Sequence, residues 1–348
     1  MRMNNMKVLL GMSGGVDSSV AALLLKKQGY DVLGATLLLT EQDDGSSAKD
    51  AKAVCDSIGI PHITEDFRIA FQKHVTDYFV AEYKAGRTPN PCIACNKNIK
   101  FGEMMKLAER NGCSALATGH YAQVVKKEDG TFVLQKAVCQ EKDQTYFLYT
   151  LPQNVLSRTI MPLGSYTKEE ARTLAEDFGL SVARKKDSQD ICFIPDGKKD
   201  MFLKNYLPDT PGSFLDTNGN IIGTHQGAFR YTVGQRKGLG MGFGKPMFVL
   251  SVDTVSNTVT LGESGMEFSE GFTIEDCSFS AFESMPETLS CLCKVRYSAK
   301  EVPCRILRTE KGYRVSLESP ARAITPGQAA VFYDGNTLLG GGTITEPR

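Results

Sequence analysis

The chain has 348 residues, and its 40 Lys and Arg are balanced by 40 Asp and Glu. This length suits two or three domains, and the zero formal net charge excludes a protein that binds nucleic acid through overall positive charge, so an RNA partner would bind to local basic patches. No apolar run is long enough to span a bilayer and no signal-peptide core precedes the first strand. We therefore expect a cytoplasmic protein without a membrane partner, whose ten cysteines are not a disulfide framework.

The first two hundred residues alternate short apolar runs, typical of strands, with stretches of helical periodicity. Strands are predicted at 7–12, 31–39, 62–64 and 115–118, and helices at 18–28, 48–58, 69–85, 97–110 and 168–178. Thr167 and Glu170 form a capping box before the last of these helices, and Gly29, Gly59 and Gly179 stand where helices would end. This alternating order predicts a doubly wound, mostly parallel α/β sheet.

Beyond residue 197 the helical periodicity fades, and Gly, Pro and Thr become frequent. Strand-like runs follow at 247–252, 258–261, 289–297, 302–307, 313–317 and 329–333. Short strands between turn residues are typical of small β domains. We expect three domains, namely an α/β domain at 1–200, a central β-rich domain at 201–268 and a C-terminal β-barrel at 269–348.

The loop from Gly11 to Ser19 lies between the first predicted strand and the first predicted helix. Its glycines let the backbone approach an anion, and the helix start supplies unpaired N–H groups and a positive dipole end. The loop is neither a Walker A motif nor a Rossmann fingerprint. It resembles the PP-loop, S-G-G-x-D-S, of ATP pyrophosphatases, whose fold is like that of the adenine-nucleotide α-hydrolases. Asp17 would help to hold Mg²⁺, because this hard cation prefers oxygen ligands beside phosphates.

Three cysteines stand out by their surroundings. Cys95 directly precedes the helix predicted near Asn96, where the helix dipole would lower the pKa of its thiol. Cys192 follows the basic run 184–186, which would also favour a thiolate. Together with Cys92 they form a three-thiol set, which suits a [4Fe–4S] cluster better than a four-ligand structural zinc site. The other seven are interpreted as core or surface thiols: Cys55, Cys113, Cys139, Cys277, Cys291, Cys293 and Cys304.

Six further segments, in order along the chain, resemble the tRNA-specific 2-thiouridylase family. They are G-R-T-P-N-P-x-x-x-C-N-K-x-I-K-F at 86–101, A-T-G-H-Y at 117–121, K-D-Q-x-Y-F-L at 142–148, D-S-x-x-I-C-F-I at 187–194, Y-T-x-G-Q-R-K-G-L at 231–239 and P-G-Q-A-x-V-F-Y at 326–333. The resemblance implies an enzyme that uses ATP to convert uridine 34, the wobble base of tRNA, to 2-thiouridine. The family pattern commonly has Asp where this chain has Cys92, which leaves the route of sulfur delivery open.

The resemblance implies that ATP adenylates O2 of the uridine and that pyrophosphate and AMP are released. Residues implied to bind ATP are Gly11, Met12, Ser13, Gly14, Gly15, Val16, Asp17, Ser18, Leu37 and Gly119. Cys192 would carry the sulfur as a persulfide, and Cys95, as nucleophile, would release it by forming a transient Cys95–Cys192 disulfide. In the alternative, a [4Fe–4S] cluster on Cys92, Cys95 and Cys192 would hold the sulfide.

The resemblance also implies contacts with tRNA, whose wobble base must leave its stack to be modified. Asn90, Pro91 and Cys92 would touch the base, with His120 nearby, and Lys142, Asp143, Gln144, Arg296, Tyr297 and Gln328 would contact the tRNA. The segment 230–238 interleaves cations, Tyr231 and glycines, which can neutralise phosphates and stack on a base. The expected partners are the tRNAs for Glu, Gln and Lys and a sulfur donor, either a cysteine desulfurase or a sulfur-carrier protein.

Two other interpretations differ in class. One is a PP-loop ligase or amidotransferase that acts on a small molecule, and the other is an inactive module that binds nucleotide and RNA. The motifs downstream of the loop argue against the first, and the presence of both Cys95 and Cys192 argues against the second.

Overall fold

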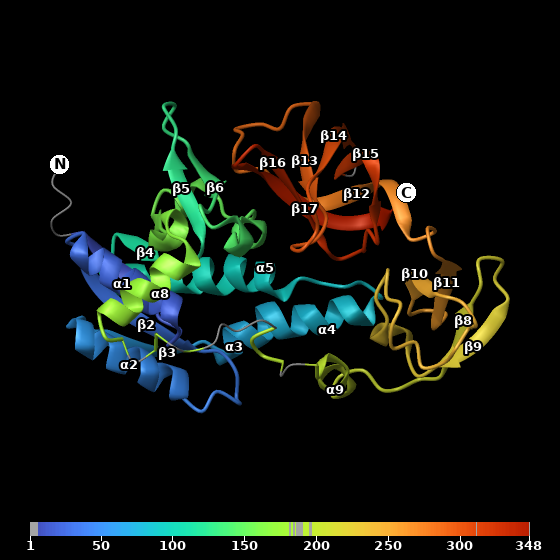
Figure 1. Cartoon of the computed structure of the whole chain (residues 1–348), viewed down its shortest axis with the longest axis horizontal. Helices are drawn as coiled ribbons and strands as arrows, with labels where there is room; N and C mark the ends of the chain where they lie inside the picture. Colours follow the sequence, from blue (N-terminus) through green and yellow to red (C-terminus); the bar gives the residue numbers. More distant parts are fainter. Residues whose placement is uncertain are drawn as a thin grey trace.

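The computed structural model describes residues 6–180, 182–183, 185, 191–194, 197–310 and 312–347. Its α/β part, its central β part and its C-terminal barrel follow one another along the chain, and a long helical column runs from the α/β sheet towards the central part (Figure 1). No helix within the described ranges is long and apolar enough to cross a membrane.

The α/β part is built on a five-stranded parallel sheet in the order β3-β2-β1-β4-β7. The strands are β1 (Lys7–Gly11), β2 (Asp31–Leu38), β3 (His62–Asp66), β4 (Ala115–Ala117) and β7 (Thr159–Ile160). Val8, Leu9 and Leu10 of the central strand are fully buried, because helices cover both faces of the sheet. The doubly wound parallel sheet predicted from the sequence is confirmed.

Each face of this sheet has its own hydrophobic core. Leu9 packs with one set of helices, namely α3 (Arg68–Phe71), the π-helical η1 (Gln72–Thr76), α4 (Asp77–Lys84), η2 (Asn96–Glu103) and α6 (Met104–Arg110). Val8 and Leu10 pack with the other set, namely α1 (Val16–Lys27), α2 (Ser46–Ile58) and α8 (Lys168–Asp177). Successive residues of a strand point to opposite faces, so three consecutive apolar residues serve two cores.

The helix that follows the two prolines begins earlier than the sequence predicts. Helix α5 (Pro91–Cys95) continues without a break into η2 and α6, whereas a start near Asn96 was expected. Pro91 occupies the first helical position, where its missing N–H costs nothing, and the side chain of Asn90 caps the helix. Shorter helices are η3 (Gln140–Lys142), η4 (Thr145–Phe147), α7 (Gln153–Leu156), η5 (Pro162–Ser165), α9 (Lys199–Lys204) and η6 (Ala228–Arg230).

The central part contains a four-stranded sheet in the order β10-β11-β8-β9. Its strands are β8 (Gly212–Leu215), β9 (Ile221–His225), β10 (Met247–Asp253) and β11 (Thr258–Glu263). Phe214, Val249, Val259 and Leu261 form its buried core. The first two strands were not predicted, because they are short and rich in Gly and polar residues.

The C-terminal part is a closed six-stranded barrel. Its strands are β12 (Phe268–Ser278), β13 (Thr288–Lys294), β14 (Val302–Thr309), β15 (Gly312–Arg322), β16 (Ala329–Asp334) and β17 (Thr337–Pro347), and β12 pairs with both β15 and β17. A hairpin of β5 (Ala122–Lys126) and β6 (Phe132–Lys136) projects from the α/β part, and its Gln135 pairs with Thr337 of β17. The barrel was expected, whereas the pairing of this hairpin with it was not.

Candidate active site at the phosphate loop and the thiol helix

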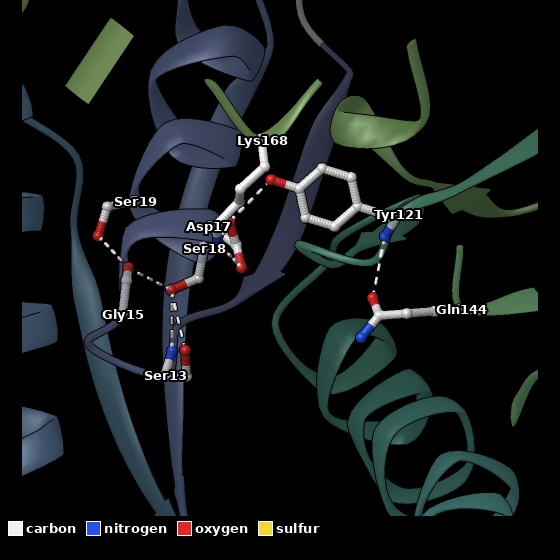
Figure 2. A network of polar contacts seen from close by, with 8 residues as sticks. All are labelled: Ser13, Gly15, Asp17, Ser18, Ser19, Tyr121, Gln144 and Lys168. Atoms are coloured by element: carbon white, nitrogen blue, oxygen red, sulfur yellow. Dashed lines mark hydrogen bonds and ion pairs between the residues drawn. The ribbon is translucent and has the colours of Figure 1, made fainter. Parts of the chain in front are cut away.

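The phosphate loop follows β1 and opens α1, as the sequence predicts. Gly14 has a φ of +66°, and a Cβ there would lie 2.6 Å from the carbonyl oxygen of Ser47, so only glycine fits. Gly119, just beyond β4, lies so close to the start of α1 that a Cβ would be 3.0 Å from the Ser18 amide nitrogen. Internal hydrogen bonds of the loop join Ser13 N to Ser18 Oγ at 3.2 Å, Ser18 Oγ to Gly15 O at 3.3 Å and Ser19 Oγ to Gly15 O at 2.8 Å (Figure 2).

The predicted ATP residues gather at this edge of the sheet, but they contribute in different ways. Met12 and Val16 are buried in a core, so only their backbone groups can face a phosphate. The Met12 amide donates to Ala35 O at 2.8 Å, which ties the loop to β2. Leu37 lies two residues further along that strand and is half-buried.

Asp17 does not stand open to a metal ion in this state. Lys168 Nζ donates to both carboxylate oxygens of Asp17, at 2.7 and 2.9 Å, and the Tyr121 hydroxyl donates to one of them at 2.9 Å (Figure 2). Lys168 is buried, so this ion pair holds a cation beside the phosphate loop. Lys185 Nζ, bonded to Gly14 O at 3.0 Å, supplies a second cation. Neither lysine was predicted as a site residue, because each is far from the loop in sequence.

Three thiols lie near one another at α5, which we call the thiol helix. Asn90 Oδ1 accepts a hydrogen bond from Cys92 N at 3.2 Å, which fixes the first turn. Cys92 and Cys192 are exposed, and Cys95 is buried. A negative charge on Cys192 raises the pKa of both other thiols, so the three lie within electrostatic reach of one another. All ten cysteines are free thiols.

The expectation that the helix dipole lowers the pKa of Cys95 is wrong for this state. Burial raises the pKa of Cys95 to about 12, and partial desolvation of the thiols of Cys92 and Cys192, which still have an exposed face, raises the pKa of both as well. The reason is geometric, because the helix begins at Pro91 and Cys95 therefore lies a full turn inside it, packed in the core.

Lys100 is the cation that opposes these increases. Its charge lowers the pKa of each of the three thiols, in each case against the larger effect of burial. In the described part of the basic run before Cys192, Lys185 bonds Gly14 and Asp50 instead. Residues 184 and 186 are outside the described ranges, so the prediction for them stays untested. Lys100 belongs to the C-N-K-x-I-K-F segment, and its place in that motif was the signal that could have identified it.

His120 is a buried residue just beyond β4. It follows Gly119, is buried, and its Nδ1 lies 2.8 Å from Thr118 Oγ1. Burial lowers its pKa well below the ordinary value, and the charge of Lys100 lowers it further, so the imidazole is neutral at physiological pH. Lys100 thus acts on both His120 and the thiols, which places the two predicted halves of the site in one neighbourhood.

A metal cluster does not fit the thiols as they are arranged here. Within the described part of the chain, no three or more His, Cys, Asp or Glu side chains form a group that could hold a metal ion. Cys92, Cys95 and Cys192 are near one another without forming such a ligand set.

Asp143 and Gln144, two of the three residues predicted to contact tRNA at 142–144, make hydrogen bonds within the protein. The carboxylate of Asp143 is buried and accepts hydrogen bonds from Ala137 N at 3.0 Å and Thr145 Oγ1 at 2.6 Å. Gln144 Oε1 accepts from Tyr121 N at 3.0 Å, as Figure 2 shows. Lys142 is half-buried in η3. These contacts position the segment, while its contact with tRNA stays a prediction.

Arg296 and Gln328 lie where domains meet. Arg296 Nη2 donates to Val233 O of the central part at 3.0 Å and to Ala323 O of the barrel at 2.8 Å. Gln328 Nε2 donates to Thr88 O at 2.9 Å. Tyr297 is partly exposed, and its ring centroid is 4.5 Å from that of Phe147, so this pair offers an aromatic surface beside η4.

The segment 230–238 divides into core and surface. Tyr231 is buried and packs against Phe214 and His225, so the expectation that it stacks on an RNA base is wrong. Arg236 and Lys237 are exposed and remain suited to phosphate contact.

Comparison with protein families divides the chain into three matches. Residues 6–196 match the tRNA methyl transferase HUP domain, residues 200–263 the tRNA methyl transferase PRC-barrel domain, and residues 269–344 the aminomethyltransferase beta-barrel domain. The first match covers more than half of the chain and contains both the phosphate loop and the thiol helix.

Curated relatives match along their whole length. The tRNA-specific 2-thiouridylase MnmA of Clostridioides difficile is 46% identical, with 98% of each chain covered. The enzyme of the same name from Carboxydothermus hydrogenoformans is 47% identical over 97% of each chain, and that of Lachnoclostridium phytofermentans is 44% identical over 97% of this chain and 99% of its own. With such identity over nearly all of both partners, the protein belongs to the tRNA-specific 2-thiouridylase family of enzymes.

Proposed function

We propose that the chain thiolates uridine 34 of tRNA, first adenylating O2 of the base with ATP and then replacing that oxygen with sulfur. The observation that carries this proposal is that the phosphate loop and the thiols lie in the same part of the molecule. Gly119 packs against the start of α1, His120 follows it, and Lys100 acts on both His120 and the three thiols.

The adenylation step uses the phosphate loop. The uridine O2 attacks the α-phosphorus of ATP, the bond between the α-phosphorus and the bridging oxygen breaks, and pyrophosphate leaves. Amide groups at the start of α1 and the cations Lys168 and Lys185 stabilise the negative charge that develops on the phosphates. Mg²⁺ would lie beside Asp17 and neutralise phosphate oxygens, a mode in which one carboxylate and the substrate phosphates suffice as ligands.

The sulfur step uses the thiols. Cys192, which is exposed, accepts a sulfur atom from the donor as a persulfide. The Cys95 thiolate attacks the inner sulfur, forming the Cys95–Cys192 disulfide and releasing hydrosulfide. Hydrosulfide attacks C2 of the adenylated base and AMP leaves, after which a thiol reductant restores both cysteines. Because burial raises the pKa of Cys95 and the charge of Lys100 lowers it, Lys100 favours the thiolate that this step uses.

We prefer the persulfide route to the [4Fe–4S] route, because the three thiols form no metal-ligand set in the described part of the chain. The proposed partners are the tRNAs for Glu, Gln and Lys, and either a cysteine desulfurase or a sulfur-carrier protein. The proposed compartment is the cytoplasm.

The test combines ATP, a tRNA transcript for Glu and a persulfide donor with the purified protein, and measures pyrophosphate release and 2-thiouridine by nucleoside mass spectrometry. We expect pyrophosphate release only with tRNA, and loss of 2-thiouridine in Cys95→Ser and Cys192→Ser with tRNA binding retained. Cys55→Ser, at a buried thiol of α2, is the matched control and should remain active. Pyrophosphate release without tRNA would support a small-molecule ligase instead, and loss of activity on removal of iron would support the cluster.

A further inference from the structure

We infer that Gln328 of the barrel is a positioning residue for the thiol helix, which it holds through the backbone of Thr88 and Pro89. This inference rests on the proposed function and adds to it a residue that acts on the site from another domain. Gln328 lies in the P-G-Q segment before β16, some 240 residues from the loop that it holds.

The contact between the barrel and the loop is a set of short polar and steric contacts. Gln328 Nε2 donates to Thr88 O at 2.9 Å and to Pro89 O at 3.3 Å. Thr88 N donates to Pro326 O at 2.8 Å. Gly327, with a φ of +89°, packs so tightly here that a Cβ would lie 2.9 Å from Thr88 N. The two segments therefore fit one another along three consecutive residues of the barrel.

The held segment leads directly to the helix cap. Asn90 follows Pro89, and its side chain caps α5 through Cys92 N. Pro89 and Pro91 each have a fixed φ, so the chain between Thr88 and the helix has little freedom to absorb a shift. A displacement at Pro89 is thus passed on to Asn90 and to the first turn of the thiol helix.

The same segment is also held by its own α/β domain and by the central part. Arg87 Nε donates to Glu82 Oε2 of α4 at 2.7 Å, within a two-pronged ion pair. Thr88 Oγ1 lies 3.4 Å from Thr232 Oγ1 of the central part. All three domains therefore meet at residues 87–89. The barrel thus contacts the chain just before the thiol helix begins.

The chain contains a matched control for the test. Gln153 of α7 also donates through Nε2 to two carbonyl oxygens, Phe132 O at 2.6 Å and Ser280 O at 2.7 Å. It thus links the α/β part to the barrel with the same chemistry as Gln328. Its acceptors belong to β6 and to the segment after β12, away from the thiol helix.

The first experiment needs no tRNA and no activity. The alkylation rate of Cys95 by iodoacetamide is followed by peptide mass spectrometry in the wild type, Gln328→Met and Gln153→Met. Methionine preserves the side-chain length and removes the donor. We expect alkylation to be roughly fivefold faster in Gln328→Met, the factor that corresponds to one net hydrogen bond, and unchanged in Gln153→Met. Equal rates in all three proteins would overturn the inference.

The second experiment separates positioning from direct tRNA contact. Positioning predicts roughly tenfold lower thiolation at saturating tRNA in Gln328→Met, with the tRNA Kd within twofold of wild type and Gln153→Met active. Weaker tRNA binding in Gln328→Met, with wild-type turnover at saturating tRNA, would overturn the inference in favour of a direct contact with tRNA. Equal losses of thiolation in Gln328→Met and Gln153→Met would overturn it as well, because they would show only that the barrel must be attached to the α/β part. If Gln328→Met does not fold, Gly327→Ala disturbs the same contact from the backbone and is read in the same way. A wild type that makes no 2-thiouridine would refute the proposed function, whereas the alkylation comparison would still test whether Gln328 positions the thiol helix.

Discussion

At the scale of single residues, two lysines set the charges of the site, namely the buried Lys168 from a distant segment and the half-buried Lys100 from the segment of the thiols. Lys168 neutralises Asp17, and Lys100 opposes the effect of burial on the thiols. A buried cation is stable only when it has an anionic partner. If Asp17 turns to a metal ion when ATP binds, a phosphate oxygen can take its place beside Lys168, so the pairing at rest prepares the loop for its substrate.

Replacement of this lysine tests that exchange. Lys168→Met should weaken ATP binding by roughly tenfold to a hundredfold, because one charge-assisted contact contributes about 1.5–3 kcal/mol. Lys168→Arg, which keeps the charge, should recover part of the loss. Calorimetric titration with ATP measures the effect, and Lys52→Met, which removes an exposed ion pair with Asp56, is the control. ATP affinity unchanged in Lys168→Met would remove this lysine from the site.

The neutral state of His120 predicts a pH dependence of stability. Its pKa in the folded chain lies below the unfolded value of about 6.5, so the unfolded chain binds a proton that the folded chain does not. Stability is therefore retained above pH 6.5 and falls as the pH drops below it, by at most about 1.4 kcal/mol per pH unit for this group. His62 and His225, whose pKa values burial also lowers, contribute in the same direction.

Urea unfolding at several pH values between 7 and 5 measures that slope. His120→Gln should flatten it, because the replacement cannot take up the proton. An identical slope in His120→Gln and wild type would show that His120 is not held neutral.

At the scale of elements, the start of α5 decides the chemistry of the thiols. With the helix beginning at Pro91, Cys92 lies in the first turn and is exposed, whereas Cys95 faces the core. A start at Asn96 would have left both in a loop. The start of the helix therefore determines which of these two thiols is exposed and which is buried.

Removal of the cap should have a local consequence. Asn90→Ala should cost about 1 kcal/mol of stability and increase the rate at which Cys95 is alkylated. Thr167→Ala removes the capping box of α8 and should cost a similar amount without affecting Cys95. Thermal unfolding together with peptide mass spectrometry measures both effects, and equal alkylation in the two variants would show that the cap does not control access to the thiol.

At the scale of the whole molecule, the two β domains are attached to each other, and both contact residues 87–89 before α5. Arg296 joins Val233 of the central part to Ala323 and Thr325 of the barrel, and its guanidinium is largely buried. Gly234 packs against Ala323 at the same junction. These contacts join the two β domains to each other, and Gln328 joins the barrel to Thr88 and Pro89.

Loss of this arginine should loosen the junction. Arg296→Met leaves Val233 O without this donor and Ala323 O with only the Thr325 hydroxyl, so we expect a loss of about 2 kcal/mol in stability. Hydrogen exchange should become faster at residues 233–235 and 323–325. Arg305→Met, on the exposed side of β14, is the control and should change stability by less than about 0.5 kcal/mol. Unchanged exchange in Arg296→Met would show that other contacts hold the domains together.

The sequence by itself determined the features that depend on neighbouring residues. Gly14 and the serines specify a phosphate loop after β1, the capping box specifies the start of α8, and Gly59 ends α2 in the left-handed conformation. Each is a short-range effect of backbone geometry or local hydrogen bonding, so it can be read from a few adjacent letters. The family resemblance rests on such segments as well.

Only the tertiary structure decided the features that join distant residues. The pKa of Cys95 depends on burial, and the partner of Asp17 lies 151 residues away. Tyr231, whose segment suggests base stacking, packs in the core of the central part. Gln328 of the barrel donates its hydrogen bonds to the α/β part. Desolvation, ion pairing and domain contact depend on what the folded chain brings together in space, and for that reason no local pattern could reveal them.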